Sequence, residues 1–187
     1  MKKTIIGIVA CTLAMATYAE LFKVDTGHSG IGFSVRHMMV SNTRGSFNKF
    51  DGTLDYDIAG KTLKSIEGWI DASSIDTNNE KRDRHLRNED FFNVAKFAKL
   101  TFRSTSVEKT GENQFMVAGK LNVLGIDRDV ELPVSVAGLV EGRQGSTLIG
   151  VDCSTVLDRR HLGITYGPAA MIGNEVKIEI ACEAVYK

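Results

Sequence analysis

The stretch of sequence that decides the fold is residues 25–50, DTGHSGIGFSVRHMMVSNTRGSFNKF. From Ile31 to Arg36, bulky apolar residues alternate with small or polar ones, and His37 ends this run. A short link leads to a second run that contains Arg44 and two phenylalanines. Period-2 alternation indicates strands with one apolar and one wet face. Polar and basic groups at the strand ends with apolar groups between them favour an apolar pocket with a polar mouth over a catalytic centre.

The same alternation recurs along the rest of the chain, with turn-forming residues between the runs. We expect strands at about 21–25, 29–37, 45–57, 62–73, 98–108, 114–124, 128–140, 146–158 and 174–186. Short strands at regular spacing, joined by hairpins, are typical of a sandwich or an up-and-down barrel.

One charged segment interrupts this rhythm. Thr77 followed by Glu80 matches a capping box, which predicts a helix at about 78–88. A short helical turn is expected at about 89–93, with Asn88 as its cap. We expect the helix to cover one side of the sheet system.

The helix carries an Arg82, Asp83 and Arg84 cluster that is most simply a set of solvated ion pairs. A second interpretation places Asp83 or His85 at the mouth of a pocket.

A closed antiparallel barrel can turn its apolar faces inward, or outward to lipid in an outer-membrane barrel. Alternation alone does not distinguish the two. Three features favour the inward form: the charged helical insert, the lack of paired aromatic girdles around Trp69, and the C-terminal residues Val185-Tyr186-Lys187, which do not end in an aromatic side chain. The prediction is an all-β fold with a short helical insert, built as an eight-stranded antiparallel barrel.

Residues 1–19 are predicted to be a signal peptide and residues 20–187 a single barrel domain. Two lysines precede an apolar run from Ile5 to Ala16, and small residues then favour cleavage before Glu20. The run is shorter than the roughly 20 residues that a membrane span needs. Lipoprotein processing at Cys11 is the alternative. Either route exports the chain, so we expect a periplasmic location.

The charge of the exported chain is close to neutral. Removing Lys2 and Lys3 leaves 21 basic and 23 acidic residues. A nucleic-acid-binding face needs a clear excess of Lys and Arg, so this balance argues against nucleic acid. It also argues against strong electrostatic docking to anionic lipid. We expect neither a nucleic-acid partner nor stable membrane insertion.

Two cysteines remain in the exported chain, and strand parity turns both Cys153 and Cys182 towards the apolar side. If their strands are neighbours, a disulfide is allowed in an oxidising compartment. The alternative is that they are two small buried hydrophobic side chains.

Sequence patterns of catalysis and metal binding are missing. The chain has no GxSxG, HExxH, CxxC or Gly-rich phosphate loop, and its four histidines are widely spaced. Asp25, His28 and Ser29 resemble parts of a hydrolase, but no second element holds them in mutual reach. Hydrogen bonds at turns and strand ends explain them more simply. We therefore expect no catalytic residue, no metal and no cofactor apart from a bound lipid.

Short motifs distributed in order along the chain resemble the YceI-like family of polyisoprenoid-binding periplasmic proteins. They are Asp25-Thr26-Gly27-His28-Ser29, Phe33-Ser34-Val35-Arg36-His37, Arg44-Gly45-Ser46-Phe47, Phe50-Asp51-Gly52, Ala72-Ser73-Ser74-Ile75-Asp76-Thr77, Arg82-Asp83, His85-Leu86, Asp90-Phe91-Phe92-Asn93-Val94, Leu100-Thr101-Phe102, Gly119-Lys120-Leu121, Leu124-Gly125-Ile126, Arg159 and Leu162-Gly163-Ile164. The sequence departs at His161, where an acidic residue is usual, and at Ala98, where the family often has Pro.

The resemblance implies a lipocalin-like barrel, commonly dimeric, that holds one long isoprenoid or other amphiphile. Strand parity and loop position nominate apolar lining residues for such a ligand. They are Ile31, Phe33, Val35, Phe50, Leu54, Leu100, Phe102, Phe115, Val117, Leu121, Leu132, Val134, Val151, Ile178 and Ile180, with Met38, Met39 and Met171 near the entrance. Basic groups suited to a phosphate or carboxylate head group are Arg36, His37, Arg44, Arg82, His85 and Arg159. For any single one of them, structural pairing with Asp76, Asp83 or Asp90 is the favoured alternative.

Three function classes stay open on the sequence. The first is a non-catalytic carrier or sequestering protein for isoprenoid quinones, polyprenyl phosphates or fatty-chain amphiphiles. The second is an enzyme that modifies such a lipid with His28, His37 or Asp83 as acid or base. The third is a partner-binding module that uses exposed strand edges.

Overall fold

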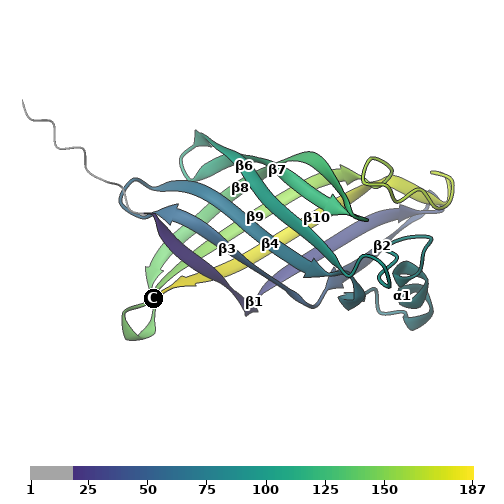
Figure 1. Ribbon diagram of the computed structural model, residues 1–187, viewed down its shortest axis with the longest axis horizontal. Coiled ribbons are helices and arrows are strands. Elements are labelled where there is room, and N and C mark those ends of the chain that lie inside the picture. Colours follow the sequence, from purple (N-terminus) through teal and green to yellow (C-terminus); the bar gives the residue numbers. More distant parts are fainter. Residues whose placement is uncertain (1–18) are drawn as a thin grey trace, which may run out of the picture.

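The computed structural model describes residues 19–187 and shows an elongated antiparallel β-barrel (Figure 1). Apart from Ala19, the predicted signal peptide lies outside the described residues. The barrel strands are β1 (Glu20–His37), β3 (Phe50–Asp57), β4 (Thr62–Asp71), β6 (Lys99–Gly111), β7 (Gln114–Val123), β8 (Ile126–Glu141), β9 (Thr147–Asp158) and β10 (Ile172–Tyr186). Each strand pairs with its neighbour in this order, and the pairing of β10 with β1 closes the barrel. The predicted eight-stranded antiparallel barrel is confirmed.

The remaining elements are short and lie near the ends of the barrel strands. They are β2 (Ser41–Phe47), β5 (Ile75–Asp76), α1 (Glu80–Arg87) and the 3₁₀ turns η1 (Ala72–Ser74) and η2 (Arg143–Gly145). No helix within residues 19–187 has the length and apolar character needed to cross a bilayer.

The opening stretch forms one long strand where two were expected. The predicted strands 21–25 and 29–37 are joined in β1, with a register irregularity between Asp25 and Gly30. Conversely, the predicted strand 45–57 is interrupted after Phe47 and continues as β3. Since β3 pairs with the first half of β1 and β2 with the second half, β1 runs the whole length of the molecule.

The helix begins two residues later than the capping box suggested, at Glu80 instead of residue 78. Asn79 is the N-cap, and its side-chain oxygen accepts a hydrogen bond of 3.0 Å from the backbone N–H of Arg82. Asn78 has a φ of 57°, in the left-handed region, which excludes it from a right-handed helix. The segment at 89–93 forms hydrogen-bonded turns rather than a helical turn, with Asn88 accepting from the N–H of Asp90.

The strands turn their apolar faces inward, and charged pairs cover the outside. Lys120 lies 2.7 Å from Asp129 across β7 and β8, and Arg103 lies 3.1 Å from Glu67 across β6 and β4. Directly opposite residues of opposite charge stabilise neighbouring strands modestly. This is the inward-facing form of the barrel that the sequence favoured.

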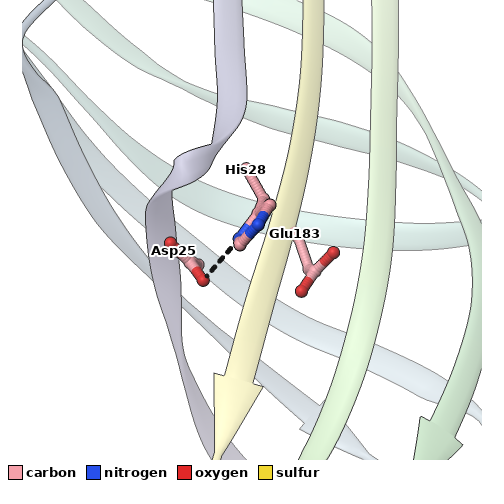
Figure 2. Close-up of side chains that lie close together, drawn as sticks. All are labelled: Asp25, His28 and Glu183. Atoms are coloured by element: carbon pink, nitrogen blue, oxygen red, sulfur yellow. Dashed lines mark hydrogen bonds and ion pairs between the residues drawn. The ribbon is translucent and has the colours of Figure 1, made fainter. Parts of the chain in front are cut away.

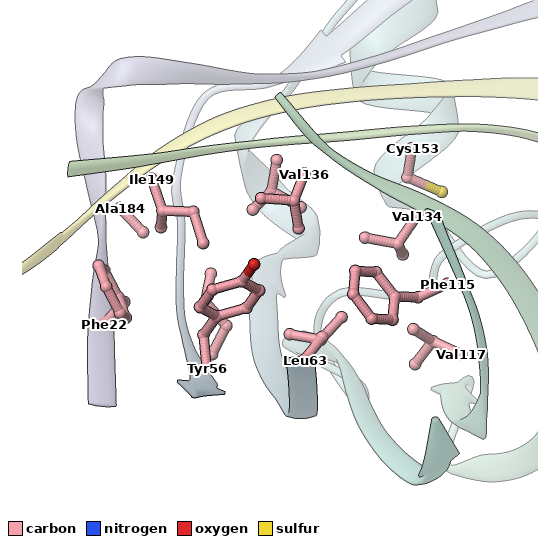
Figure 3. Close-up of a cluster of buried hydrophobic side chains, with 12 residues drawn as sticks. Phe22, Tyr56, Leu63, Phe115, Val117, Val134, Val136, Ile149, Cys153 and Ala184 are labelled. Atoms are coloured by element: carbon pink, nitrogen blue, oxygen red, sulfur yellow. The ribbon is translucent and has the colours of Figure 1, made fainter. Parts of the chain in front are cut away.

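The main hydrophobic core fills one end of the barrel, where the β3–β4, β6–β7 and β8–β9 turns lie (Figure 3). Phe22, Tyr56, Leu63 and Ile149 are each at most 1% exposed there. Burying each such side chain contributes about 1.5–3 kcal/mol. A smaller cluster of Phe91, Val123 and Ile164 lies at the opposite end, so the two clusters leave the middle of the barrel between them.

Candidate ligand-binding cavity

The barrel encloses a cavity of about 540 Å³ with a predominantly apolar lining. This volume falls in the range of pockets that hold small ligands. Most of the side chains nominated by strand parity line it. They are Ile31, Phe33, Val35, Phe50, Leu54, Leu100, Phe102, Leu121, Leu132, Val134, Val151, Ile178 and Ile180, together with Met171.

Two of the nominated lining residues lie elsewhere. Phe115 and Val117 point inward as parity predicted, but they belong to the packed end of the barrel and are at most 1% exposed. They fill the interior beside the cavity and do not line it. Parity gives the direction of a side chain, whereas its position along the barrel axis decides whether it meets other side chains or open space.

The cavity wall also contains aromatic side chains that strand parity did not nominate. Phe91 and Phe92 follow α1, and Tyr166 lies in the segment between β9 and β10, so no strand alternation marks them. Trp69 of β4 is on the same face of the strand as Glu67, and Lys99 Nζ lies 4.0 Å from its ring centroid, so its ring is on the outside of the barrel. The family-like run Asp90-Phe91-Phe92 was the signal that could have nominated the first two.

The cavity is bordered at one end by α1, the segment at 159–171 and the ends of β1 and β2, and we call this end its mouth. His85 of α1 places its Nε2 atom 2.9 Å from Oδ2 of Asp90. The same imidazole ring lies edge-on to Phe91 at 5.1 Å and to Tyr166 at 5.0 Å between ring centroids. His85 therefore joins the helix to both loops that border the cavity.

Arg159 is a structural residue, which corrects its nomination as a head-group ligand. Its side chain lines the cavity but is only 3% exposed. A guanidinium has five N–H donors, and all five bond to backbone carbonyls. The acceptors are Ile164, Tyr166, Gly167, Ile172 and Gly173, at 2.8–3.1 Å. Burial lowers the pKa of Arg159 from its ordinary value. No donor is left for a ligand.

Four other nominated basic groups line the cavity: Arg36, His37, Arg82 and His85. Arg82 bonds Thr77 through Nε at 2.7 Å and through Nη2 at 2.8 Å. Its Nη1 atom has no hydrogen-bond partner among residues 19–187. This nitrogen is a free cationic donor at the mouth.

Three nominated residues lie on the outer surface. Arg44 of β2 does not line the cavity. Met38 and Met39 form the turn between β1 and β2 and are 53% and 63% exposed. Of the three nominated methionines, only Met171 reaches the cavity wall.

The expected ion-pair cluster of Arg82, Asp83 and Arg84 does not form among these three residues. Arg84 lies 3.0 Å from Glu80. Asp83 is buried and accepts hydrogen bonds from the N–H and the hydroxyl of Thr77 instead of pairing with an arginine. Its carboxylate therefore anchors the start of the helix to the preceding segment.

Cys153 and Cys182 both line the cavity, and both thiols are free. Their strands are neighbours, but the residues are not opposite each other: Cys153 pairs with Ile180, and Cys182 with Val151. Burial raises the pKa of Cys153 to about 11 and also raises that of Cys182. Of the two interpretations that the sequence left open, a disulfide and two small apolar side chains, the structure shows the second.

Outside the barrel, Asp25, His28 and Glu183 lie close together (Figure 2). His28 Nδ1 is 2.9 Å from Asp25 Oδ2, and this hydrogen bond raises the pKa of His28 and lowers that of Asp25. Ser29 bonds the backbone of Asp25 and Glu183 rather than His28, so these residues form no catalytic triad. The sequence did not reveal this cluster because Glu183 comes from β10, at the far end of the chain.

A closed antiparallel barrel that is packed at one end and hollow towards the other is the architecture of lipocalin-like binding proteins. The chain belongs to the YceI-like family, since the YceI-like domain model matches residues 22–184. It is 32% identical over 192 residues to Protein YceI of Salmonella newport, covering 99% of this chain and 98% of that protein.

Solved structures share the fold. The YceI protein of Campylobacter jejuni is 27% identical, with a TM-score of 0.76 over 81% of this chain and 90% of that one. A polyisoprenoid-binding domain from Saccharophagus degradans is 16% identical, with a TM-score of 0.70 over 89% of this chain and 98% of that domain. The latter likeness shows the fold alone.

Proposed function

We propose that the protein is a non-catalytic carrier for one long-chain isoprenoid or similar amphiphilic lipid, held inside the barrel. The observation that carries the proposal is the apolar cavity of about 540 Å³ between the two hydrophobic clusters. The structurally similar domain from Saccharophagus degradans is a polyisoprenoid-binding domain, which supports the same ligand class. An isoprenoid quinone, a polyprenyl phosphate and a fatty-chain amide all match this chemistry.

Burial of the hydrocarbon chain supplies the affinity. Each buried methylene contributes about 0.8 kcal/mol, so about ten methylenes contribute roughly 8 kcal/mol. This is comparable to mid-range estimates of the cost of association, and a longer chain therefore binds tightly. The lining offers few polar partners, so polar groups act at the mouth, where they select and orient the head group.

The proposed orientation is tail inward and head group at the mouth. The packed end of the barrel is apolar, whereas Arg36, His37, Arg82 and His85 line the cavity towards α1 and the neighbouring loops. The free Nη1 of Arg82 is the best placed donor for a phosphate, carboxylate or carbonyl oxygen.

A matched pair of substitutions on β9 tests the proposal. Thr155 lines the cavity, while its neighbour Val156 is 55% exposed on the outside. In Thr155→Phe the added ring displaces about three methylenes of ligand, which weakens binding roughly fiftyfold at about 0.8 kcal/mol each. Val156→Phe keeps the original affinity. The measurement is titration with a fluorescent polyprenyl lipid, and an unchanged affinity in Thr155→Phe would refute binding inside the barrel.

Native mass spectrometry of freshly purified protein, followed by solvent extraction, identifies the lipid. A carrier returns the lipid intact and shows no turnover, whereas an enzyme converts it and shows a pH-rate profile. The contacts favour the carrier, because Asp83 is bonded to Thr77 and His28 lies outside the barrel with Asp25. The same spectra measure the subunit stoichiometry, for which the family resemblance leads us to propose a dimer.

Export is part of the proposal and rests on the pattern of residues 1–19. The intact mass of protein isolated from a periplasmic fraction is expected to correspond to a chain that begins at Glu20. A mass that includes a lipidated Cys11 would support the lipoprotein alternative.

A further inference from the structure

Exposed apolar side chains gather at the end of the barrel that holds the cavity mouth. Met38, Met39 and Val40 are 53%, 63% and 77% exposed in the β1–β2 turn, and Met171 is 41% exposed just before β10. The N–H of Met38 donates a hydrogen bond of 2.9 Å to the carbonyl of Met171, so the two segments are adjacent. We name these four residues the methionine tip.

The local sequence of the turn is unusual for its backbone. Met38 and Met39 have φ values of 49° and 62°, both in the left-handed region. Hairpin turns of this kind strongly favour Asn and Gly, which tolerate positive φ. Two methionines are therefore poor turn formers at these positions. Residues that break a local rule without a structural gain are expected at functional sites, and flexible thioethers suit contact with an irregular apolar surface.

The methionine tip is continuous with the cavity. Met171 belongs to the tip and also lines the cavity. Arg36 and His37, immediately before the turn, line the cavity as well. Figure 1 shows this end of the barrel, with α1 and β2, opposite the chain's C-terminus. Met171 thus connects the exposed tip to the cavity wall.

Two arginines without an acidic partner flank the tip. Arg36 donates to the carbonyl of Met39 at 2.9 Å, and Arg160 donates to the carbonyl of Gly167 at 2.7 Å. Neither guanidinium forms an ion pair within 4.0 Å among residues 19–187, although the backbone N–H of Arg160 donates to Asp158. Their positive charges are complementary to anionic lipid head groups.

We propose that the methionine tip docks reversibly into the head-group region of an anionic lipid bilayer and sets the cavity mouth against it. The ligand would then pass between bilayer and barrel without crossing water. This inference rests on the proposed lipid-carrier function. Because the net charge of the described chain is close to neutral, apolar contact provides the attraction and the arginines select the anionic surface. A few partly inserted side chains give weak, reversible binding.

The test uses the full exported chain and vesicles of phosphatidylglycerol mixed with phosphatidylethanolamine. The double variant Met38→Asn/Met39→Gly removes the apolar side chains and installs the favoured turn residues, so the fold is preserved. We expect co-sedimentation with these vesicles to weaken about tenfold or more. Val140→Ser, which removes a 62% exposed side chain on β8 near the β8–β9 turn, is the control and should bind like the unaltered protein.

A second comparison tests the charge. Arg160→Gln should weaken binding to the phosphatidylglycerol vesicles several-fold and leave binding to pure phosphatidylcholine vesicles unchanged. Unaltered vesicle binding by Met38→Asn/Met39→Gly would overturn the proposal. A second outcome would also overturn it. If the unaltered protein does not bind vesicles but forms a dimer that the variant loses, the tip is a contact between two copies of the chain.

Uptake of a fluorescent polyprenyl lipid from solution separates this inference from the carrier function. Met38 and Met39 do not line the cavity, so uptake from solution should be equal in the variant and the unaltered protein. Failure of uptake in both proteins would refute the carrier function itself. If the variant and the unaltered protein take up the lipid normally and bind vesicles equally well, the docking surface is refuted and the carrier function stands.

Discussion

At the scale of single residues, the Asp25–His28 pair makes a defined contribution to pH dependence. Its hydrogen bond raises the pKa of His28 above the ordinary 6.5 and lowers that of Asp25 below 3.8. The raised His28 pKa stabilises the fold fully below pH 6.5, and this contribution is lost as the pH rises through the raised value. The lowered Asp25 pKa stabilises the fold above pH 3.8, and this contribution is lost as the pH falls through the lowered value. The pair is therefore most effective between these limits.

We expect Asp25→Asn to return the pKa of His28 towards its ordinary value, because the hydrogen bond to a carboxylate is the largest cause of the shift. The amide oxygen can still accept from Gly27, so the turn is kept. An NMR titration of the imidazole measures the change. An unaltered His28 pKa would mean that the hydrogen bond to Asp25 does not form in solution.

At the scale of elements, the segment at 159–171 takes its shape from Arg159. The segment contains no helix or strand within its bounds, and the guanidinium gathers five of the nearby carbonyls, from Ile164 to Gly173. Arg159→Lys leaves at least two of these carbonyls without a donor, since a lysine has only three. We expect a loss of about 3 kcal/mol or more in the free energy of unfolding.

Urea denaturation measures this loss, with Arg160→Lys as the matched control. Arg160 is exposed and makes fewer hydrogen bonds, so its replacement should cost less than about 1 kcal/mol. Equal midpoints for the two variants would contradict the structural role of Arg159.

The positions of the strands could be predicted from the sequence because they depend on which side chains are buried. Every barrel strand has an inward apolar face, so alternation located them all. The exact ends of the elements depend on backbone geometry, which the alternation of side chains does not reveal. Examples are the break between Phe47 and Phe50 and the positive φ of Asn78, which moves the start of α1 to Glu80. Arg159 was misread because its carbonyl partners lie in a segment without a pattern.

At the scale of the whole molecule, strand parity predicted which side chains face the interior but not where the interior is hollow. Leu132 and Phe115 both point inward, yet only Leu132 meets the cavity. The difference arises because Phe22, Tyr56 and Phe115 belong to the core cluster that packs one end of the barrel. The extent of that packing depends on contacts between strands far apart in the sequence.

The two cavity thiols allow occupancy of the whole barrel to be measured. Cys153 and Cys182 line the cavity, and the barrel interior is their route to solvent. The raised pKa of Cys153, about 11, keeps that thiol protonated and slow to react at neutral pH. A bound lipid tail excludes reagent from both sulfurs, so we expect alkylation by a maleimide to slow about tenfold or more in the lipid-loaded protein. Mass spectrometry follows the rate in loaded and delipidated samples of the same preparation. Ligand that binds only the native state also raises the melting temperature, so a lipid that raises it without protecting the thiols would have to bind outside the cavity.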